Sequence, residues 1–256
     1  MNTRLTRPLN ALMLALCSAA IVVPAAPALA GSWNSERVRG SGQVKTEARA
    51  LGHFNGVALA LPGSVELRIG NTESITVETD DNLLPLIDTV VENGTLKIRA
   101  ARRNVNFDTR RMKFVVQAKG VETLAVDGSG SINADALRGS KVTVAIGGSG
   151  SINVKSIDSE SLSVNIGGSG DLKVHGGAAK RLSVAIAGSG DVDMGRLQST
   201  DASVNIAGSG DATIAVRDQL KVIIAGSGDV NYYGDPRVST TVGGSGSAIK
   251  LAGAPR

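Results

Sequence analysis

The amino-acid sequence predicts an all-β fold, a parallel β-helix (β-solenoid) of short coils, on three observations. The triplet Gly-Ser-Gly recurs at steps of 20, 20, 20, 20, 18 and 18 residues, starting at positions 128, 148, 168, 188, 208, 226 and 244. Apolar residues alternate with small or polar ones on both sides of the triplets, as strands require. The 256 residues include 32 Gly but only three Phe, two Tyr and one Trp, so the core cannot depend on aromatic packing.

The first 30 residues have the composition of a secretory signal peptide. Arg4 and Arg7 precede an apolar run from Ala11 to Val23, and Ala28-Leu29-Ala30 is typical of a cleavage site. The run is about thirteen residues long, shorter than the ~20 that a membrane-spanning helix needs. We therefore expect an exported protein, periplasmic or extracellular at the cell surface, with no membrane span in its mature part. The single cysteine lies in this segment, so disulfides are not expected either.

The rest of the chain divides into a short N-terminal segment and one long domain. Residues 31–52 are predicted to be a polar linker or an N-terminal cap, and residues 53–253 a single β-helix domain. Residues 53–120 contain strand-like stretches such as SVELRI and TLKIRA without strict spacing, which predicts irregular coils. A brief helix over Leu83–Val90 is also expected, although Pro85 weakens it. Residues 121–251 carry the regular Gly-Ser-Gly repeats.

Each regular repeat predicts two strands and a tight corner. Leu162, Val164 and Ile166 alternate before one triplet, and Leu172 and Val174 alternate after it. A period of 18 to 20 residues with two or more short strands suits one coil of a β-solenoid. Equivalent inward side chains then stack in ladders about 4.8 Å apart. The glycines allow a sharp turn because they accept a positive φ without a Cβ penalty.

The order of these segments resembles a bacterial protein family. FNGVALALPGSVELRIG at 54–70, ESITVETDDNLLPLIDTVVENGTLKIRA at 73–100 and the Gly-Ser-Gly ladder are together similar to the auto-transporter adhesin, head GIN domain family. The resemblance covers about residues 54–251. It implies a right-handed parallel β-helix that is secreted or surface-associated, and it supplies no catalytic residues.

An acidic residue follows four of the triplets, at Asp171, Asp191, Asp211 and Asp229. In a solenoid these residues form a column, and neighbouring carboxylates repel each other by about 1 kcal/mol in water. We interpret them as solvated turn residues, with a weak calcium site as the alternative. The calcium-binding repeat G-G-x-G-x-D has its Asp one residue later and a nine-residue period. We therefore expect no cofactor.

Positive charge is concentrated between residues 97 and 113, where the only acid is Asp108. We take six of its basic residues as candidates for binding an anionic polysaccharide of the envelope or of a host: Arg99, Arg102, Arg103, Arg110, Arg111 and Lys113. A solvated loop with outward strand residues is the alternative interpretation. A nucleic-acid partner is not expected, because the chain is predicted to be exported and aromatic residues are not interleaved with the basic ones.

No catalytic motif is complete in this sequence. The residue two places after each triplet serine is Asp or Ser rather than the Gly of a nucleophile elbow. The recurring acids are spread along the helix axis, whereas a glycosidase needs two carboxyls in one cleft. We predict a non-catalytic, adhesin-like or structural envelope protein. It would bind a polysaccharide or self-associate through an edge left open after Leu251. A polysaccharide-active β-helix enzyme is the alternative.

Overall fold

The computed structural model describes residues 36–253 and confirms an all-β fold built on a parallel β-helix. The predicted signal peptide, residues 1–30, lies outside the described residues. The N-terminal part contains β1 (Glu36–Arg39), β2 (Val44–Ala50), β3 (Gly56–Leu59), β4 (Ser64–Ile69), β5 (Ser74–Asp80), a 3₁₀ turn η1 (Leu84–Leu86), β6 (Ile87–Glu92), β7 (Thr95–Ala100), β8 (Val105–Asp108) and β9 (Lys113–Ala118).

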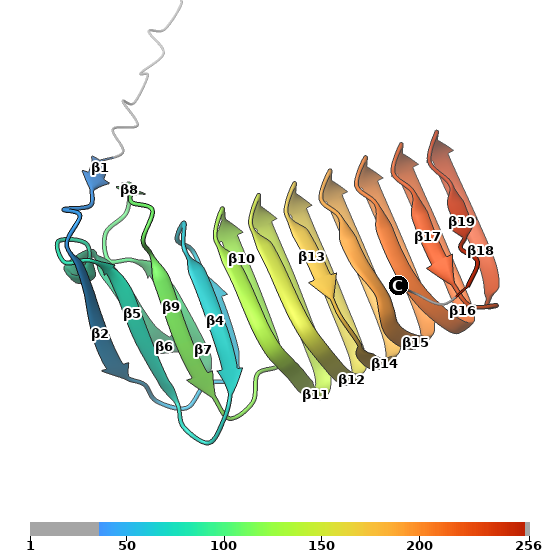
Figure 1. Cartoon of the computed structure of the whole chain (residues 1–256). Coiled ribbons are helices and arrows are strands. Elements are labelled where there is room, and N and C mark those ends of the chain that lie inside the picture. Colours follow the sequence, from blue (N-terminus) through green and yellow to red (C-terminus); the bar gives the residue numbers. More distant parts are fainter. Residues whose placement is uncertain (1–35, 254–256) are drawn as a thin grey trace, which may run out of the picture. The chain divides into compact units, whose positions relative to one another are not determined.

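The regular part begins at residue 123 and stacks strand upon strand (Figure 1). It contains β10 (Thr123–Gly128), β11 (Ser131–Gly148), β12 (Ser151–Gly168), β13 (Asp171–Val174), β14 (Gly177–Gly188), β15 (Val192–Gly208), β16 (Ala212–Gly226), β17 (Val230–Tyr233), β18 (Arg237–Gly244) and β19 (Ala248–Lys250). The long strands, such as β11 and β12 with 18 residues each, run around a bend and contribute to more than one face.

Parallel ladders form three faces of the helix. Face A joins β7, β3 and β10 to the last residues of β11, β12, β14, β15 and β16 and then to β18. Face B joins β9 and β4 to the first residues of β11 and β12, to β13, to the first residues of β15 and β16, and to β17 and β19. Face C is a shorter ladder, which includes residues 136–139, 156–159, 177–179 and 197–199.

The register places equivalent residues of successive coils directly on one another. Val144 pairs with Val164, Val164 with Val184, and the ladder continues through Val204 to Val222. All five side chains are buried, and each contributes roughly 1.5–3 kcal/mol relative to exposure. Such aliphatic ladders form the core of the regular part, which explains how a chain with so few aromatic residues can fold.

Stacking of backbone on backbone explains the glycines at the corners. Gly168 has a φ of 119°, and a Cβ on it would overlap the carbonyl group of Gly148 in the coil below. A Cβ on Gly170 would lie 2.5 Å from the carbonyl oxygen of Gly150, a distance that side chains do not adopt. The backbone N–H of Ser169 donates to the carbonyl oxygen of Gly148 at 2.8 Å. The corner therefore has no room for a side chain at either glycine.

The N-terminal coils are not arranged in sequence order. On face A, β3 lies between β7 and β10, and on face B, β4 lies between β9 and β11. Strands β3 and β4, which come first in the sequence, therefore form the second coil along the axis of the β-helix, and β7 and β9 form the outer coil. The chain reaches the outer position through antiparallel pairs, which join β2 to β5, β5 to β9 and β6 to β7.

The helix expected over Leu83–Val90 is wrong. Only a single 3₁₀ turn, η1, forms there, with Pro85 in its first turn. The following residues, from Ile87 onward, form β6 and pair antiparallel with β7. The β-branched residues of that stretch suit a strand better than a helix.

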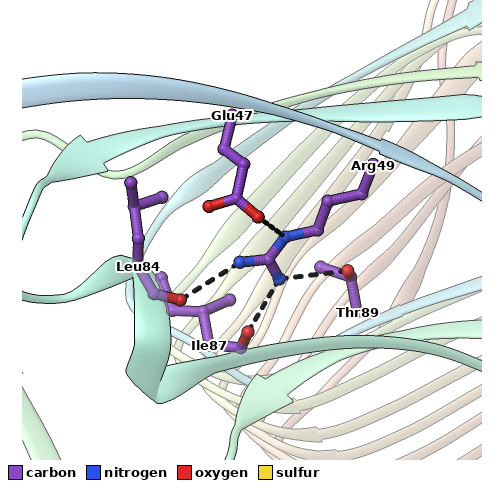
Figure 2. Close-up of polar contacts among 5 residues, drawn as sticks. All are labelled: Glu47, Arg49, Leu84, Ile87 and Thr89. Carbon is purple, nitrogen blue, oxygen red and sulfur yellow. Dashed lines mark hydrogen bonds and ion pairs between the residues drawn. The ribbon is translucent and has the colours of Figure 1, made fainter.

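The side chain of Arg49 connects separate segments at the N-terminal end of the β-helix (Figure 2). The guanidinium group of Arg49, on β2, donates to the carbonyl oxygens of Ile87 at 2.8 Å and Leu84 at 3.1 Å, and to Oγ1 of Thr89 at 3.2 Å. Its Nε atom also pairs with Glu47 at 2.8 Å. The side chain of Arg49 thereby links the outermost strand of face B to η1 and β6, and it satisfies carbonyls at the end of the 3₁₀ turn.

The last coil ends differently. Strand β18 pairs with β16 along one edge and β19 pairs with β17, while no described residue pairs with their other edges. Every residue of β18 is exposed. The core therefore ends at this coil without a covering layer in the part of the chain that the structure describes.

Candidate functional site

The basic residues between positions 97 and 113, which include the six candidates for ligand binding, fall into two groups in the structure. Lys97 and Arg99, on β7, both contact Glu92 of β6, with Lys97 Nζ 2.7 Å and Arg99 Nη2 2.8 Å from its carboxylate oxygens. Lys113, on β9, lies 2.7 Å from Glu66 of β4. These three cations are thus paired within the fold, so they contribute less free positive charge than the sequence predicted.

The paired carboxylates show the electrostatic effect of these contacts. The hydrogen bond from Lys97, followed by that from Arg99, holds the pKa of Glu92 below its ordinary value. The hydrogen bond from Lys113, followed by that from Arg68, does the same for Glu66. Both carboxylates therefore stay ionised to a lower pH than an ordinary glutamate does.

The second group consists of four arginines on the turns that flank β8. Arg102 and Arg103 precede the strand, and Arg110 and Arg111 follow it. All four are exposed, and none forms an ion pair with another residue of the described range 36–253. Their positive charge therefore faces solvent at both ends of one short strand.

Pairing of β1 with β8 adds two arginines that the sequence analysis did not select. Arg37 lies opposite Asn106 and Arg39 opposite Asp108 in this parallel two-stranded sheet. Val38 and Phe107 are partly buried against the core, so the alternate residues Arg37 and Arg39 project to the outer side, where both are exposed. We call the whole set the arginine ribbon: Arg37, Arg39, Arg102, Arg103, Arg110 and Arg111.

A hollow lies beside the arginine ribbon. Its volume is about 410 Å³, and Arg37, Asn106 and Asp108 line it together with Pro62 and Phe107. It thus offers a cation, an amide and a carboxylate over an apolar floor. No sequence signal pointed to it, because its two walls, the β8 region and residues 60–62, are more than 40 positions apart.

The aspartate column is a hydrogen-bonded ladder in the structure. Oδ1 of Asp191 accepts from the backbone N–H of Asp211 at 2.9 Å, and Oδ1 of Asp211 accepts from that of Asp229 at 2.7 Å. Asp229 accepts in the same way from both the N–H and the hydroxyl group of Ser247, each at 2.8 Å. Each carboxylate thus binds the coil above it. Among residues 36–253, no three His, Cys, Asp or Glu gather as a metal site would require.

Further hollows lie on faces A and B. One of about 640 Å³, at the start of face A, is lined by Arg181, Asp201 and Arg237 among others. Two of about 540 and 440 Å³ on face B share His175, which the sequence analysis had not assigned to a site. Each is a shallow depression between the outward side chains of neighbouring coils.

The shifted pKa values among the acids of the described region all lie below the ordinary values. Six carboxyl groups have shifted pKa values, and hydrogen bonds, five of them from Lys or Arg and one from Ser41, are the largest cause of a downward shift at each: Glu66, Asp81, Glu92, Glu160, Asp218 and Asp235. In Asp218 the donor is Arg217 and in Asp235 it is Lys250. A glycosidase acid instead needs a raised pKa to hold its proton.

Most of this chain matches a known protein family. Residues 53–236 match the family described as "Putative auto-transporter adhesin, head GIN domain". No curated protein matches the sequence. Within the described residues, no helix is long and apolar enough to cross a membrane.

Solved structures share the fold. A "putative adhesin" from Bacteroides fragilis has a TM-score of 0.76 at 20% identity, with 84% of this chain and 100% of that one covered. A "putative lipid binding protein" from Parabacteroides distasonis has a TM-score of 0.68 at 24% identity, covering 85% and 100%. A "putative adhesin" from Parabacteroides merdae has a TM-score of 0.68 at 21% identity, again covering 85% and 100%. At these identities the likeness shows the fold alone.

Proposed function

Because the chain belongs to the "Putative auto-transporter adhesin, head GIN domain" family, we propose that it is an exported, non-catalytic, adhesin-like protein that binds an acidic polysaccharide. The arginine ribbon is the surface that would bind it. The observation that carries this proposal is that Arg102, Arg103, Arg110 and Arg111 are exposed and unpaired within residues 36–253, while the neighbouring basic residues are neutralised.

The shape of the arginine ribbon suits an extended polymer. The four residues of β8 span roughly 13 Å, so the two pairs of arginines present charge at separated points along a line. A guanidinium group forms bidentate hydrogen bonds with planar carboxylates and with sulfate-like oxyanions. A chain of uronic acids or sulfated sugars supplies such groups at regular intervals.

The regular coils support a non-catalytic role. Their acids form a ladder with backbone N–H groups or pair with lysines of neighbouring coils, as Asp135 does with Lys155 at 2.6 Å and Glu160 with Lys180 at 2.9 Å. These contacts hold coil to coil. The regular part would then serve as a rigid spacer, and the N-terminal part as the binding end, at or near the cell envelope.

The proposal is tested by retention of the purified chain, residues 31–256, on an array of acidic and neutral polysaccharides, with and without calcium. The test variant carries Arg102, Arg103, Arg110 and Arg111 changed to Ala. A matched control carries Lys141, Arg181, Lys221 and Arg237 changed to Ala, which removes the same charge from exposed positions on the regular coils. Circular dichroism checks that all three proteins are folded.

We expect retention on acidic polymers only, and we expect it to weaken with added NaCl because the contacts are ionic. The test variant should lose at least tenfold in affinity and the control less than threefold. Equal behaviour of the two variants, or no retention of the unmodified chain, contradicts the proposal. Release of new reducing ends from a retained polymer would instead favour the alternative, a polysaccharide-active enzyme.

A further inference from the structure

The C-terminal end of the helix exposes residues that belong to core columns. Val238 and Val242, on β18, are 40% exposed each, although their register partners in the coil below, Leu220 and Ile224, are only 1% exposed. Ile249, on β19, is 43% exposed. Val238 and Val242 point the same way as the buried ladder, but no described residue lies above them.

The same end exposes unpaired backbone. Strand β18 has eight residues, and its outer edge has no partner among residues 36–253. Such an edge is a template for adding another strand, and natural proteins usually block it with charge, proline or a covering segment. Strand β18 begins with Arg237, directly after Pro236, whereas its other residues, 238–244, carry no charged side chain and no proline.

The N-terminal end offers no matching surface. Its outermost strand on face B, β2, carries Lys45, Glu47 and Arg49 along its length. Arg49 is tied to η1 and β6, and antiparallel strands replace the parallel coils there. Strand β18 lies on face A, so head-to-tail stacking of copies would place its edge against β6, the outermost strand of face A at the N-terminal end. Strand β6 carries Asp88 and Glu92, and the carbonyl oxygen of Ile87 already accepts from Arg49, so a repeating filament is disfavoured.

The side chains of β18 around Thr240 follow a similar order in both chain directions. Residues 238–242 read Val-Ser-Thr-Thr-Val, which is symmetric about Thr240 in the chemistry of its side chains. In an antiparallel pair centred on Thr240, Val238 lies opposite Val242 of a second copy, and Ser239 lies opposite the second copy's Thr241. Cross-strand pairs of β-branched residues are favourable. A two-fold axis through Thr240 satisfies every one of these pairs at once.

We propose that the chain forms a closed dimer in which the β18 edges of two copies pair antiparallel and bury Val238 and Val242. The end of a coil offers on the order of 400 Å² to a second copy, about half of the ~800 Å² per partner in a standard interface. The dimer is therefore weak and depends on concentration. It places the two arginine ribbons at opposite ends of one continuous solenoid, so the proposal concerns assembly and does not rest on the ligand.

Sedimentation equilibrium of residues 31–256, from about 1 μM to 1 mM, tests the proposal. We expect the weight-average mass to rise toward twice that of the monomer and to level off there. The variant Val238→Lys/Val242→Lys should remain monomeric throughout. The control Val44→Lys, which alters an exposed valine of β2 at the other end, should behave like the unmodified chain. A monomer at all concentrations, growth beyond a dimer, or an unaffected double variant overturns the proposal.

Cross-linking gives a second readout that does not depend on variant stability. The segment 31–256 has no cysteine, so Thr240→Cys introduces a single thiol that would face its own copy across the two-fold axis, at a Cβ separation within disulfide reach. We expect most of this variant to become a disulfide-linked dimer under mild oxidation. The control is Thr46→Cys at the middle of β2, which should stay mainly monomeric. Equal cross-linking of both variants overturns the proposal.

Discussion

The hydrophobic core ends in different ways at the two ends of this β-helix. At the N-terminal end, antiparallel strands and the hydrogen bonds of Arg49 cover the core and satisfy its carbonyls. At the C-terminal end, β18 simply stops, and core-column residues remain exposed. The comparison shows that a repeat specifies how a coil binds the next one but contains no signal for ending the stack. Termination needs particular side chains, which the regular coils lack.

The Gly-Ser-Gly corners also differ, depending on whether the coil below is irregular or regular. Gly128, at the first Gly-Ser-Gly corner, has a φ of 105°, and a Cβ on it would meet nothing within 4 Å. Gly168 has a similar φ of 119°, but a Cβ there would overlap the carbonyl group of Gly148. The first corner follows the irregular coil of β3 and β4, and the later ones stack on an identical corner.

The largest expected effect separates these two kinds of corner. Gly168→Ala should destabilise the chain by at least about 3 kcal/mol, because it combines an unfavourable φ with a backbone overlap. Gly128→Ala should cost only about 1–2 kcal/mol, from the positive φ alone. Urea denaturation monitored by circular dichroism measures both. Equal losses at the two positions would mean that backbone stacking does not set the Gly-Ser-Gly repeat.

The next effect concerns closure of the N-terminal end. Arg49→Met removes the donors to the carbonyls of Ile87 and Leu84, and we expect a loss of about 2–3 kcal/mol in the free energy of unfolding. Lys45→Met, on the same strand but exposed and without an ion pair among residues 36–253, should change it by less than about 0.5 kcal/mol. Hydrogen exchange should show that β2 and β6 open first in the Arg49 variant. An unchanged exchange rate there would contradict the closing role of Arg49.

A smaller effect is expected in the aspartate ladder of the regular coils. Asp211→Ala removes the acceptor for the N–H of Asp229 and should cost at most about 1 kcal/mol, because the site is exposed to water. Asp211→Asn retains an acceptor oxygen and should stay within about 0.5 kcal/mol of the original chain. Thermal denaturation with and without about 5 mM calcium, enough to fill a weak site, tests the predicted weak calcium site as well. A calcium-dependent rise in Tm that the Asn variant loses would assign a cation to the column.

The smallest effect is the acid response of the N-terminal ion pairs. The pKa of Glu92 lies below its ordinary value because Lys97 and Arg99 donate to its carboxylate. Its contribution to stability is therefore present above the ordinary pKa, near 4.5, and is lost as the pH falls through the lowered pKa of the folded state. Glu92→Gln should have a slightly lower Tm at pH 7 and the same Tm as the original chain at strongly acidic pH. A difference that grows on acidification would contradict this assignment.

The regular coils could be predicted from the sequence because all of their information is local. The spacing of Gly-Ser-Gly and the alternation of residues such as Val164 and Ile166 fix the strand, the corner and the register together. The N-terminal part could not, since the position of β3 between β7 and β10 depends on antiparallel pairs between distant segments. For the same reason the sequence did not place Arg37 beside β8, and it did not show that Lys113 pairs with Glu66, which is 47 positions away.

We propose above all that the arginine ribbon at the N-terminal end binds an acidic polymer while the regular coils act as a spacer. Hydrogen exchange of residues 31–256 with and without alginate, a polyuronate, tests it most directly, with uncharged dextran as the control. We predict that alginate slows exchange in residues 36–39 and 101–111 and leaves residues 123–250 unchanged. Protection confined to the regular coils, or the same protection with dextran, would contradict the claim.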